Sequence, residues 1–381
     1  MSLSAKKILA ARSPDLRIDL LRGLATWFLF LDHVPHNVVN LITLRNFGFS
    51  GATDVFVFVS GYAAAVLFGT MAHERGFVVT TTRMFRRMWQ LYAAYVVLFV
   101  IYIDIIGNVA AQYATTEIID EYNVTGIVDH PIRTLMRGVM LQAKPLNLDT
   151  LQLFIALMAF FPLVLWSILR RPNLTLAASF LLYAAARMFD WSLPSFPSGS
   201  WYFNPFCWQL LFVLGSWFAL NGARLTAAAQ RMAWLRITAA VYLVFALVVA
   251  LASHAPAAAG ALADFGLDPF TRTDKENLAP YRVAHLLALG LIFTYLVPRC
   301  LPALRSRLLQ PVMKCGEEWL ASFCVGVFLS FAAHFILITG PASIAMQVLV
   351  SATGIAMMTA IACYLSWSRR QDSASGRRAE V

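Results

Sequence analysis

Residues 149–169 read DTLQLFIALMAFFPLVLWSIL, an apolar run in which Asp149 is the one charged side chain. A helix needs about 20 apolar residues to cross the hydrocarbon core of a bilayer, and this run is long enough. Comparable runs recur at 18–36, 52–70, 89–106, 173–189, 205–220, 237–253, 282–298, 319–338 and 342–366. The run therefore predicts one helix of a protein that crosses the membrane about ten times.

The composition excludes an ordinary soluble domain. Of the 381 residues, 59% are apolar and 13% are charged, whereas soluble domains carry about 25% charged residues. The fold class that we predict is all-α, a polytopic membrane helical bundle of about ten transmembrane helices. Residues 1–16 form the expected cytoplasmic N-terminal segment, 17–368 a single transmembrane domain and 369–381 a cytoplasmic tail.

The distribution of Lys and Arg predicts the orientation of this bundle. Ten spans place both termini on one side, and that side holds 22 of the 30 Lys and Arg residues but only 7 of the 20 acids. Basic residues collect in cytoplasmic loops. We therefore expect both termini in the cytoplasm (N-in/C-in) and the chain in a bacterial inner membrane. Topology also explains the net charge of +10, so no nucleic-acid partner is expected.

The segments between the spans add two expectations. Outer segments fall at 107–148, 191–205 and 254–281, and the first includes Pro131 to Gln142, which suits a short helix at the membrane interface. The five cysteines form no CxxC pair. We therefore expect neither a disulfide framework nor a metal site.

The first span holds the most informative ionisable residues, because such residues inside a membrane usually face a cavity or a partner. Asp19 and Arg22 share a helix face at the cytoplasmic end, where a local ion pair is one explanation. His33 follows Arg22 by about 16 Å of helix rise, toward the outer rim. Its imidazole can take up a proton near neutral pH, so His33 beside Asp32 is a candidate general base. The alternative is a core histidine bonded to a neighbour.

The second span begins near Asp54, at a depth similar to that of His33. The Asp54 carboxylate is therefore a candidate partner for that imidazole. Residues 61–65 are all small apart from Tyr62, which favours close helix packing. Near the outer ends of later spans, His285 and His334 are expected to be hydrogen-bonding groups in the bundle interior.

Two further clusters each have a structural and a binding interpretation. The cytoplasmic arginines Arg83, Arg86 and Arg87 are topology determinants, or they bind an anionic phosphate ligand. An outer cluster of aromatic and amide side chains is an interfacial belt, or it binds sugar rings. The outer cluster comprises Trp191, Trp201, Tyr202, Phe203, Asn204, Trp208 and Gln209.

An ordered set of motifs carries a family resemblance. The set begins with RIDLLRG at 17–23, DH at 32–33, DVFVFVSGY at 54–62 and the arginine-rich run at 83–92. It continues with KPLNLD at 144–149, FNPFCWQLLFVLG at 203–215, DKENLAP at 274–280, RVAHLLAL at 282–289 and CGEEWLASFCVG at 315–326. Gln152-Leu-Phe departs from the Pro-Leu-Tyr that the family often has. From residue 15 to 340 the chain resembles the OpgC family of integral-membrane acyltransferases.

The resemblance implies transfer of a succinyl group from cytoplasmic succinyl-coenzyme A to hydroxyls of osmoregulated periplasmic glucans. It assigns the catalytic histidine to His33 and the preceding acid to Asp32. The implied donor-binding residues are Arg83, Arg86, Arg87 and Ser60. We expect no permanently bound cofactor, with the acyl-coenzyme A donor as a substrate and with membrane lipid and periplasmic glucan as partners. The oligomeric state is left open.

The mechanism that we expect is general-base catalysis. His33 removes the proton of a glucan hydroxyl while Asp32 or Asp54 orients the ring. The expected acceptor-binding residues are Trp201, Asn204, Trp208, Gln209 and Asp149. The oxyanion stabiliser is open among Ser60, Asn37 and Gln209, and a two-step route through an acylated enzyme is also open.

An acidic acyl group would favour a cation beside His33, for which Arg45, Arg187 and Arg282 are the nearest candidates. Other interpretations of the chain are an acyltransferase with another acyl group or glycan acceptor, and a transporter of glycan or lipid. A transporter should show paired broken helices in repeated halves, which the sequence lacks. A haem-type electron carrier would need histidines paired across facing helices. Release of coenzyme A that depends on the acceptor separates an acyltransferase from both.

Overall fold

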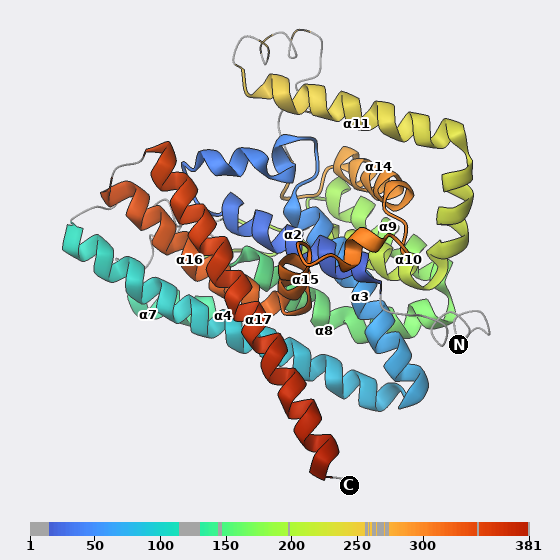
Figure 1. The fold of residues 1–381 in the computed structure, drawn as a ribbon, viewed down its shortest axis with the longest axis horizontal. Helices are drawn as coiled ribbons and strands as arrows, with labels where there is room; N and C mark the ends of the chain where they lie inside the picture. The colour runs from blue at the N-terminus through green and yellow to red at the C-terminus, as the bar shows by residue number, and fades with distance from the viewer. Residues whose placement is uncertain are drawn as a thin grey trace. The chain divides into compact units, whose positions relative to one another are not determined.

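The computed structural model describes residues 15–113, 130–143, 147–196, 199–255, 274–340 and 343–379, and the single positions 258, 260, 264 and 270. These described residues contain α-helices and short 3₁₀-helices but no β-strand (Figure 1). The all-α fold class is therefore confirmed.

A helix lies at each of the ten predicted segments. The helices are α2 (Leu16–Asp32), α3 (Ala52–Glu74), α4 (Phe77–Tyr113), α8 (Asp149–Arg170), α9 (Pro172–Met188), α10 (Pro205–Arg231), α11 (Ala233–Ser253), α14 (Pro280–Leu296), α16 (Trp319–Thr339) and α17 (Ile344–Ala379). Seven of them, α3, α4, α8, α10, α11, α16 and α17, are long and apolar enough to cross a membrane, and α14 is a shorter apolar helix. The chain thus fits a multi-pass membrane protein, while ten crossings and the N-in/C-in orientation stay predictions.

Several helix ends differ from the predicted boundaries. Helix α2 ends at Asp32 rather than at residue 36, because Pro35 disfavours helical backbone in the residue before it. The chain then continues through two 3₁₀-helices, η1 (Val38–Ile42) and η2 (Leu44–Asn46). Helix α17 continues to Ala379, well past the apolar run that ends at residue 366, because arginine, glutamine and alanine are good helix formers.

Besides η1 and η2, three further short elements of the described residues lie outside the ten segments. Helix α7 (Pro131–Val139) confirms the short helix expected between Pro131 and Gln142. The 3₁₀-helix η3 (Pro302–Arg305) and the eight-residue helix α15 (Gln310–Glu317) lie in a segment expected to be a cytoplasmic loop.

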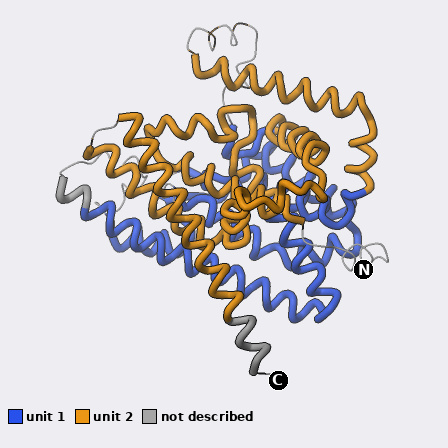
Figure 2. The backbone as a smooth tube through the Cα atoms, in the orientation of Figure 1, with its two compact units in different colours: residues 1–12, 60–223, 274–279 blue, residues 13–59, 224–273, 280–381 orange. Residues whose placement is uncertain are grey.

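Contacts divide the chain into two compact units (Figure 2). Unit 1 contains the described residues of 60–223 and 274–279, and unit 2 contains those of 13–59, 224–273 and 280–381. Within unit 1, helix α8 packs against α4 and α9. Close packing at Gly61 is confirmed, because a Cβ added there would lie 2.1 Å from the Phe212 carbonyl oxygen, and Ser216 Oγ donates to the Gly61 carbonyl over 3.0 Å.

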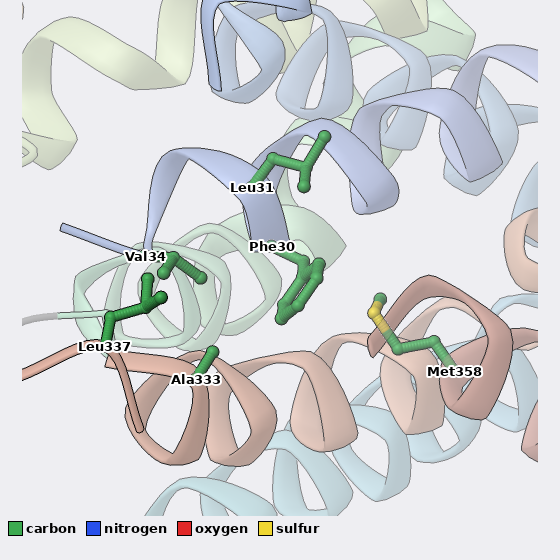
Figure 3. Close-up of a cluster of buried hydrophobic side chains, with 6 residues drawn as sticks. All are labelled: Phe30, Leu31, Val34, Ala333, Leu337 and Met358. Atoms are coloured by element: carbon green, nitrogen blue, oxygen red, sulfur yellow. The ribbon is translucent and has the colours of Figure 1, made fainter. Parts of the chain in front are cut away.

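Within unit 2, α2 packs against α15 and α16, and α16 packs against α17. Figure 3 shows the apolar cluster that joins the end of α2 to α16 and α17. Phe30 fills space that glycines leave open, since a Cβ added at Gly354 would lie 2.2 Å from the Phe30 ring. The other buried members are Leu31, Val34, Ala333, Leu337 and Met358. This cluster fixes the helix turn that leads to His33.

An ionic cluster holds the other end of α2. The Asp15 carboxylate caps the helix and pairs with the guanidinium groups of Arg17 and Arg299, each over 2.8 Å. Arg17 also donates to the carbonyl oxygen of Val297 just after α14. Burial raises the pKa of Asp15, but its hydrogen bond to Arg17 and the charges of Arg17 and Arg299 outweigh burial, so the pKa lies below its ordinary value. The cluster therefore ties the start of α2 to the end of α14.

The contact between α2 and α15 predicts a stability effect at Gly316. A Cβ added there would lie 1.9 Å from the Asp19 carbonyl oxygen. Because backbone rather than a flexible side chain is in the way, Gly316→Ala should force the helices apart and cost roughly 1–3 kcal/mol. We expect a lower melting temperature of the purified protein in detergent. Gly290→Ala is the matched control, since nothing lies within 4 Å of its added Cβ; equal melting temperatures for the two variants would contradict the close approach.

Candidate functional site

The predicted catalytic pair lies at the end of α2, in unit 2. Asp32 is the last residue of the helix and His33 is its C-cap, with the His33 backbone N–H 3.1 Å from the carbonyl oxygens of Leu29 and Phe30. Both side chains are partly buried. The pair therefore lies at the end of a packed helix, and both side chains remain partly accessible.

The Asp32 carboxylate is held by the segment that follows η1. Its Oδ1 accepts a hydrogen bond from Thr43 Oγ1 over 2.6 Å and lies 3.3 Å from Arg45 Nε. The Arg45 side chain is 45% exposed, and the Asp32 side chain is 11% exposed. The hydroxyl donor and the guanidinium fix the position of this carboxylate, which is suited to stabilise a positive charge on a neighbouring ring.

The segment that carries these partners is itself anchored to α17. Asn37 Nδ2 donates to Ser351 Oγ over 2.8 Å, and the Val38 backbone N–H donates to Gln347 Oε1 over 2.7 Å. Asn46 Nδ2 closes the segment by donating to the Asn40 carbonyl oxygen over 2.7 Å. These hydrogen bonds define the path of residues 37–46, and so they place Thr43 and Arg45 at Asp32.

Asp54 has a partner that the sequence analysis assigned to a different role. Its side chain is fully buried, and it accepts hydrogen bonds from Arg282 Nη2 over 2.6 Å and from the Gly51 backbone N–H over 2.8 Å. Arg282 is one of the three candidate cations for the acyl group, but its side chain is only 4% exposed and is bound to Asp54. That Asp54 orients His33 stays a prediction.

The histidine of α14 packs beside this ion pair. Ser50 Oγ lies 2.5 Å from His285 Nδ1, and both residues are buried. A Cβ added at Gly48 would lie 2.2 Å from His285 Nε2, so only glycine leaves room for the ring. His285 is thus confirmed as a hydrogen-bonding group of the interior. His334 is also buried, and its ring stacks with that of His36 at a centroid distance of 6.4 Å.

The predicted donor-binding residues lie in unit 1. Arg83 and Arg86 are exposed on α4, and Arg87 Nη1 donates to Gln90 Oε1 over 3.2 Å. Positions three and four apart on a helix share a face, so the three cations present one basic surface. Ser60, on α3, is buried, and its hydroxyl has no hydrogen-bond partner within the described part of the chain.

Most of the predicted acceptor-binding residues are engaged inside unit 1. Trp208 is fully buried and donates to the Lys275 carbonyl oxygen over 3.0 Å. Asn204 Nδ2 donates to the carbonyl oxygen of Trp191 over 2.6 Å and to Asn277 Oδ1 over 2.9 Å. These bonds join the start of α10 to the turn at 274–279, which is a structural role that the sequence analysis did not foresee.

The other three predicted acceptor-binding residues also lie in or next to helices of unit 1. Gln209 Nε2 donates to the Ser179 carbonyl oxygen over 2.8 Å, Trp201 is 8% exposed, and Asp149 is the first residue of α8. Gln152, which differs from the proline that the family often has, donates to the Ala143 carbonyl oxygen over 2.6 Å and to the Tyr95 hydroxyl over 3.1 Å. A role of these residues in acceptor binding stays a prediction.

Sequence reasoning missed the pairing of Asp32 with Thr43, of Asp54 with Arg282 and of His285 with Ser50. Thr43 and Ser50 lie in a segment without periodicity, so no local signal marks them. Arg282 and His285 do carry a signal, because their spacing of three puts both on one face of α14. No group of three or more metal-ligating side chains occurs in the ranges that the structure describes.

The fold and the site together define a class of protein. It is a multi-pass helical membrane protein in which a histidine and a carboxylate lie at the end of one helix, with a buried ion pair elsewhere in the same unit. The chain belongs to the OpgC protein family, whose family model matches residues 14–370. The resemblance noted in the sequence is thereby confirmed, and it indicates a membrane acyltransferase. Neither the curated proteins nor the solved structures hold a significant match to the chain.

Proposed function

We propose that this chain is an inner-membrane O-succinyltransferase. The donor is cytoplasmic succinyl-coenzyme A, and the acceptors are hydroxyls of periplasmic glucans. Membership of the OpgC family supports the reaction class. The observation that carries the proposal is the placement of Asp32 beside His33 at the end of α2, with Thr43 and Arg45 on the carboxylate.

His33 acts as the general base in this proposal. Its imidazole accepts the proton of a glucan hydroxyl, and the Asp32 carboxylate stabilises the imidazolium that forms. The alkoxide oxygen attacks the thioester carbonyl carbon, so that a C–O bond forms and the C–S bond breaks. The proton passes from His33 to the departing thiolate, which leaves as free coenzyme A. No permanently bound cofactor takes part.

The substrate-binding roles are proposals of the same kind. Arg83, Arg86 and Arg87 bind the phosphates of the donor, because guanidinium groups pair with phosphate oxygens through several hydrogen bonds. The exposure of Arg83 and Arg86 supports this assignment. Ser60 is a further donor contact. The glucan meets the outer residues Trp201, Asn204, Trp208, Gln209 and Asp149.

Release of coenzyme A tests the proposed reaction. We expect the purified protein to release free coenzyme A from succinyl-coenzyme A only when a glucan is present. Periplasmic glucans from a strain that lacks the protein should have lost the mass of succinyl groups. A protein that moves glycan or lipid would consume no donor. Another acyl group on the wild-type glucans would leave the acyltransferase class standing and correct the donor.

A further inference from the structure

Arg45 differs from the other arginines considered for the acyl group. Its Nε atom lies 3.3 Å from Asp32 Oδ1, and its side chain is 45% exposed. Neither terminal amino group of its guanidinium has a partner in the part of the chain that the structure describes. Arg45 therefore has hydrogen-bond donors available beside the carboxylate that neighbours His33.

The other two candidate arginines, Arg282 and Arg187, are already paired with acidic side chains. Arg282 is buried, and both its Nε and its Nη2 donate to Asp54. Arg187 belongs to unit 1, where its Nη1 donates to Asp274 over 2.9 Å and to the Asn277 carbonyl oxygen over 2.7 Å. Arg282 is thus buried with its charge paired to Asp54, and the charge of Arg187 is already paired to Asp274.

We propose that Arg45 is the specificity-determining residue that binds the free carboxylate of a dicarboxylic acyl group. The inference rests on the proposed function, and it adds the residue that distinguishes an acidic acyl group from a neutral one. A guanidinium presents paired N–H groups that match the two oxygens of a carboxylate. Since Asp32 takes the Nε side, the terminal amino groups are the donors left for the ligand.

The position of Arg45 suits this role, because the acyl group must have its thioester carbonyl near His33. Asp32 is the chain neighbour of His33 and its carboxylate contacts Arg45, so the cation lies at the same end of α2 as the base. The two methylene groups of a succinyl chain separate its carbonyl from its carboxylate by a short distance. The bonds of Asn37 and Val38 to α17 keep the segment that leads to Arg45 in place.

The chemistry also predicts what Arg45 does not do. A half-exposed ion pair contributes little to stability, so the protein should fold when Arg45 is replaced. A neutral acyl chain of the same length has no group for the guanidinium to bind. Loss of Arg45 should therefore lower transfer from donors with a carboxylate far more than transfer from donors without one.

The test compares two donors of equal chain length, succinyl-coenzyme A and butyryl-coenzyme A, with glucan as the acceptor. Arg45→Gln should lower kcat/KM for the succinyl donor by about tenfold to hundredfold, the range of charge-assisted hydrogen bonds. The value for the butyryl donor should fall much less, since that donor feels only the loss of the contact with Asp32, and Arg45→Lys should recover part of the succinyl rate. Arg133→Gln, which removes an exposed arginine of α7, is the matched control and should alter neither rate.

The outcomes separate this proposal from the proposed function. An equal loss with both donors, or no loss with either, would overturn the role of Arg45 while the acyltransferase stands. A wild-type protein that releases no coenzyme A from any acyl donor would remove the proposed function, and the role of Arg45 with it. A much larger loss with the succinyl donor than with the butyryl donor supports the assignment.

Discussion

Replacing His33 with glutamine is expected to abolish acyl transfer and leave the protein folded. The substitution removes the proton acceptor, while the backbone N–H of residue 33 still bonds to the end of α2. General-base catalysis contributes about 10²–10⁴ in rate, so coenzyme A release should fall by at least the lower value. The measurement is the initial rate of coenzyme A release from succinyl-coenzyme A with glucan present.

Two controls distinguish loss of the base from a general effect of the substitution. His73→Gln changes an exposed histidine at the end of α3 and should retain the wild-type rate. The melting temperature of the His33 variant should match that of the wild type, because glutamine keeps a hydrogen-bonding side chain at this partly buried position. A folded His33→Gln protein with a normal rate would show that another group removes the hydroxyl proton.

Hydropathy was enough to locate the helices, because each apolar segment matches a helix. It was not enough to find their ends. Helix α17 extends through the arginines at 369–370, which a helix accommodates but an apolar window excludes. Helix α15 escaped detection because it has eight residues and packs through Gly316 on the backbone of α2. Such an element is specified by its neighbours rather than by its own periodicity.

The candidate site, like the fold, could be predicted only in part: its residues could be identified, but their partners could not. Asp32 and His33 stand out because ionisable residues are costly within an apolar run. Their surroundings do not stand out, because the bonds that build them join distant positions. Asn37 bonds to Ser351, and Asp54 bonds to Arg282, over separations of 314 and 228 residues. Composition and spacing carry no information on such pairs, so the partner of Asp54 had to come from the structure.

The largest loss of stability is expected from Asp54→Ala. The carboxylate lies fully buried against Arg282, whose side chain is 4% exposed. Removing it would leave a guanidinium charge without a counterion in a site that water does not reach, and breaking a buried pair costs roughly 3–5 kcal/mol. The melting temperature in detergent should fall further for this variant than for Gly316→Ala. Arg282→Ala should have an effect of similar size, because it leaves the opposite charge uncompensated.

The double variant Asp54→Leu with Arg282→Met gives the matched control. It replaces both charges with apolar side chains of similar volume, an exchange that is often neutral or stabilising for buried pairs. Its melting temperature should therefore exceed that of either single variant, and a double variant as unstable as the singles would show that the ion pair is not the cause. The same protein tests the chemistry of Asp54. If it is folded and releases coenzyme A at the wild-type rate, Asp54 acts through packing alone; if it is folded and inactive, the ion pair is needed for the reaction.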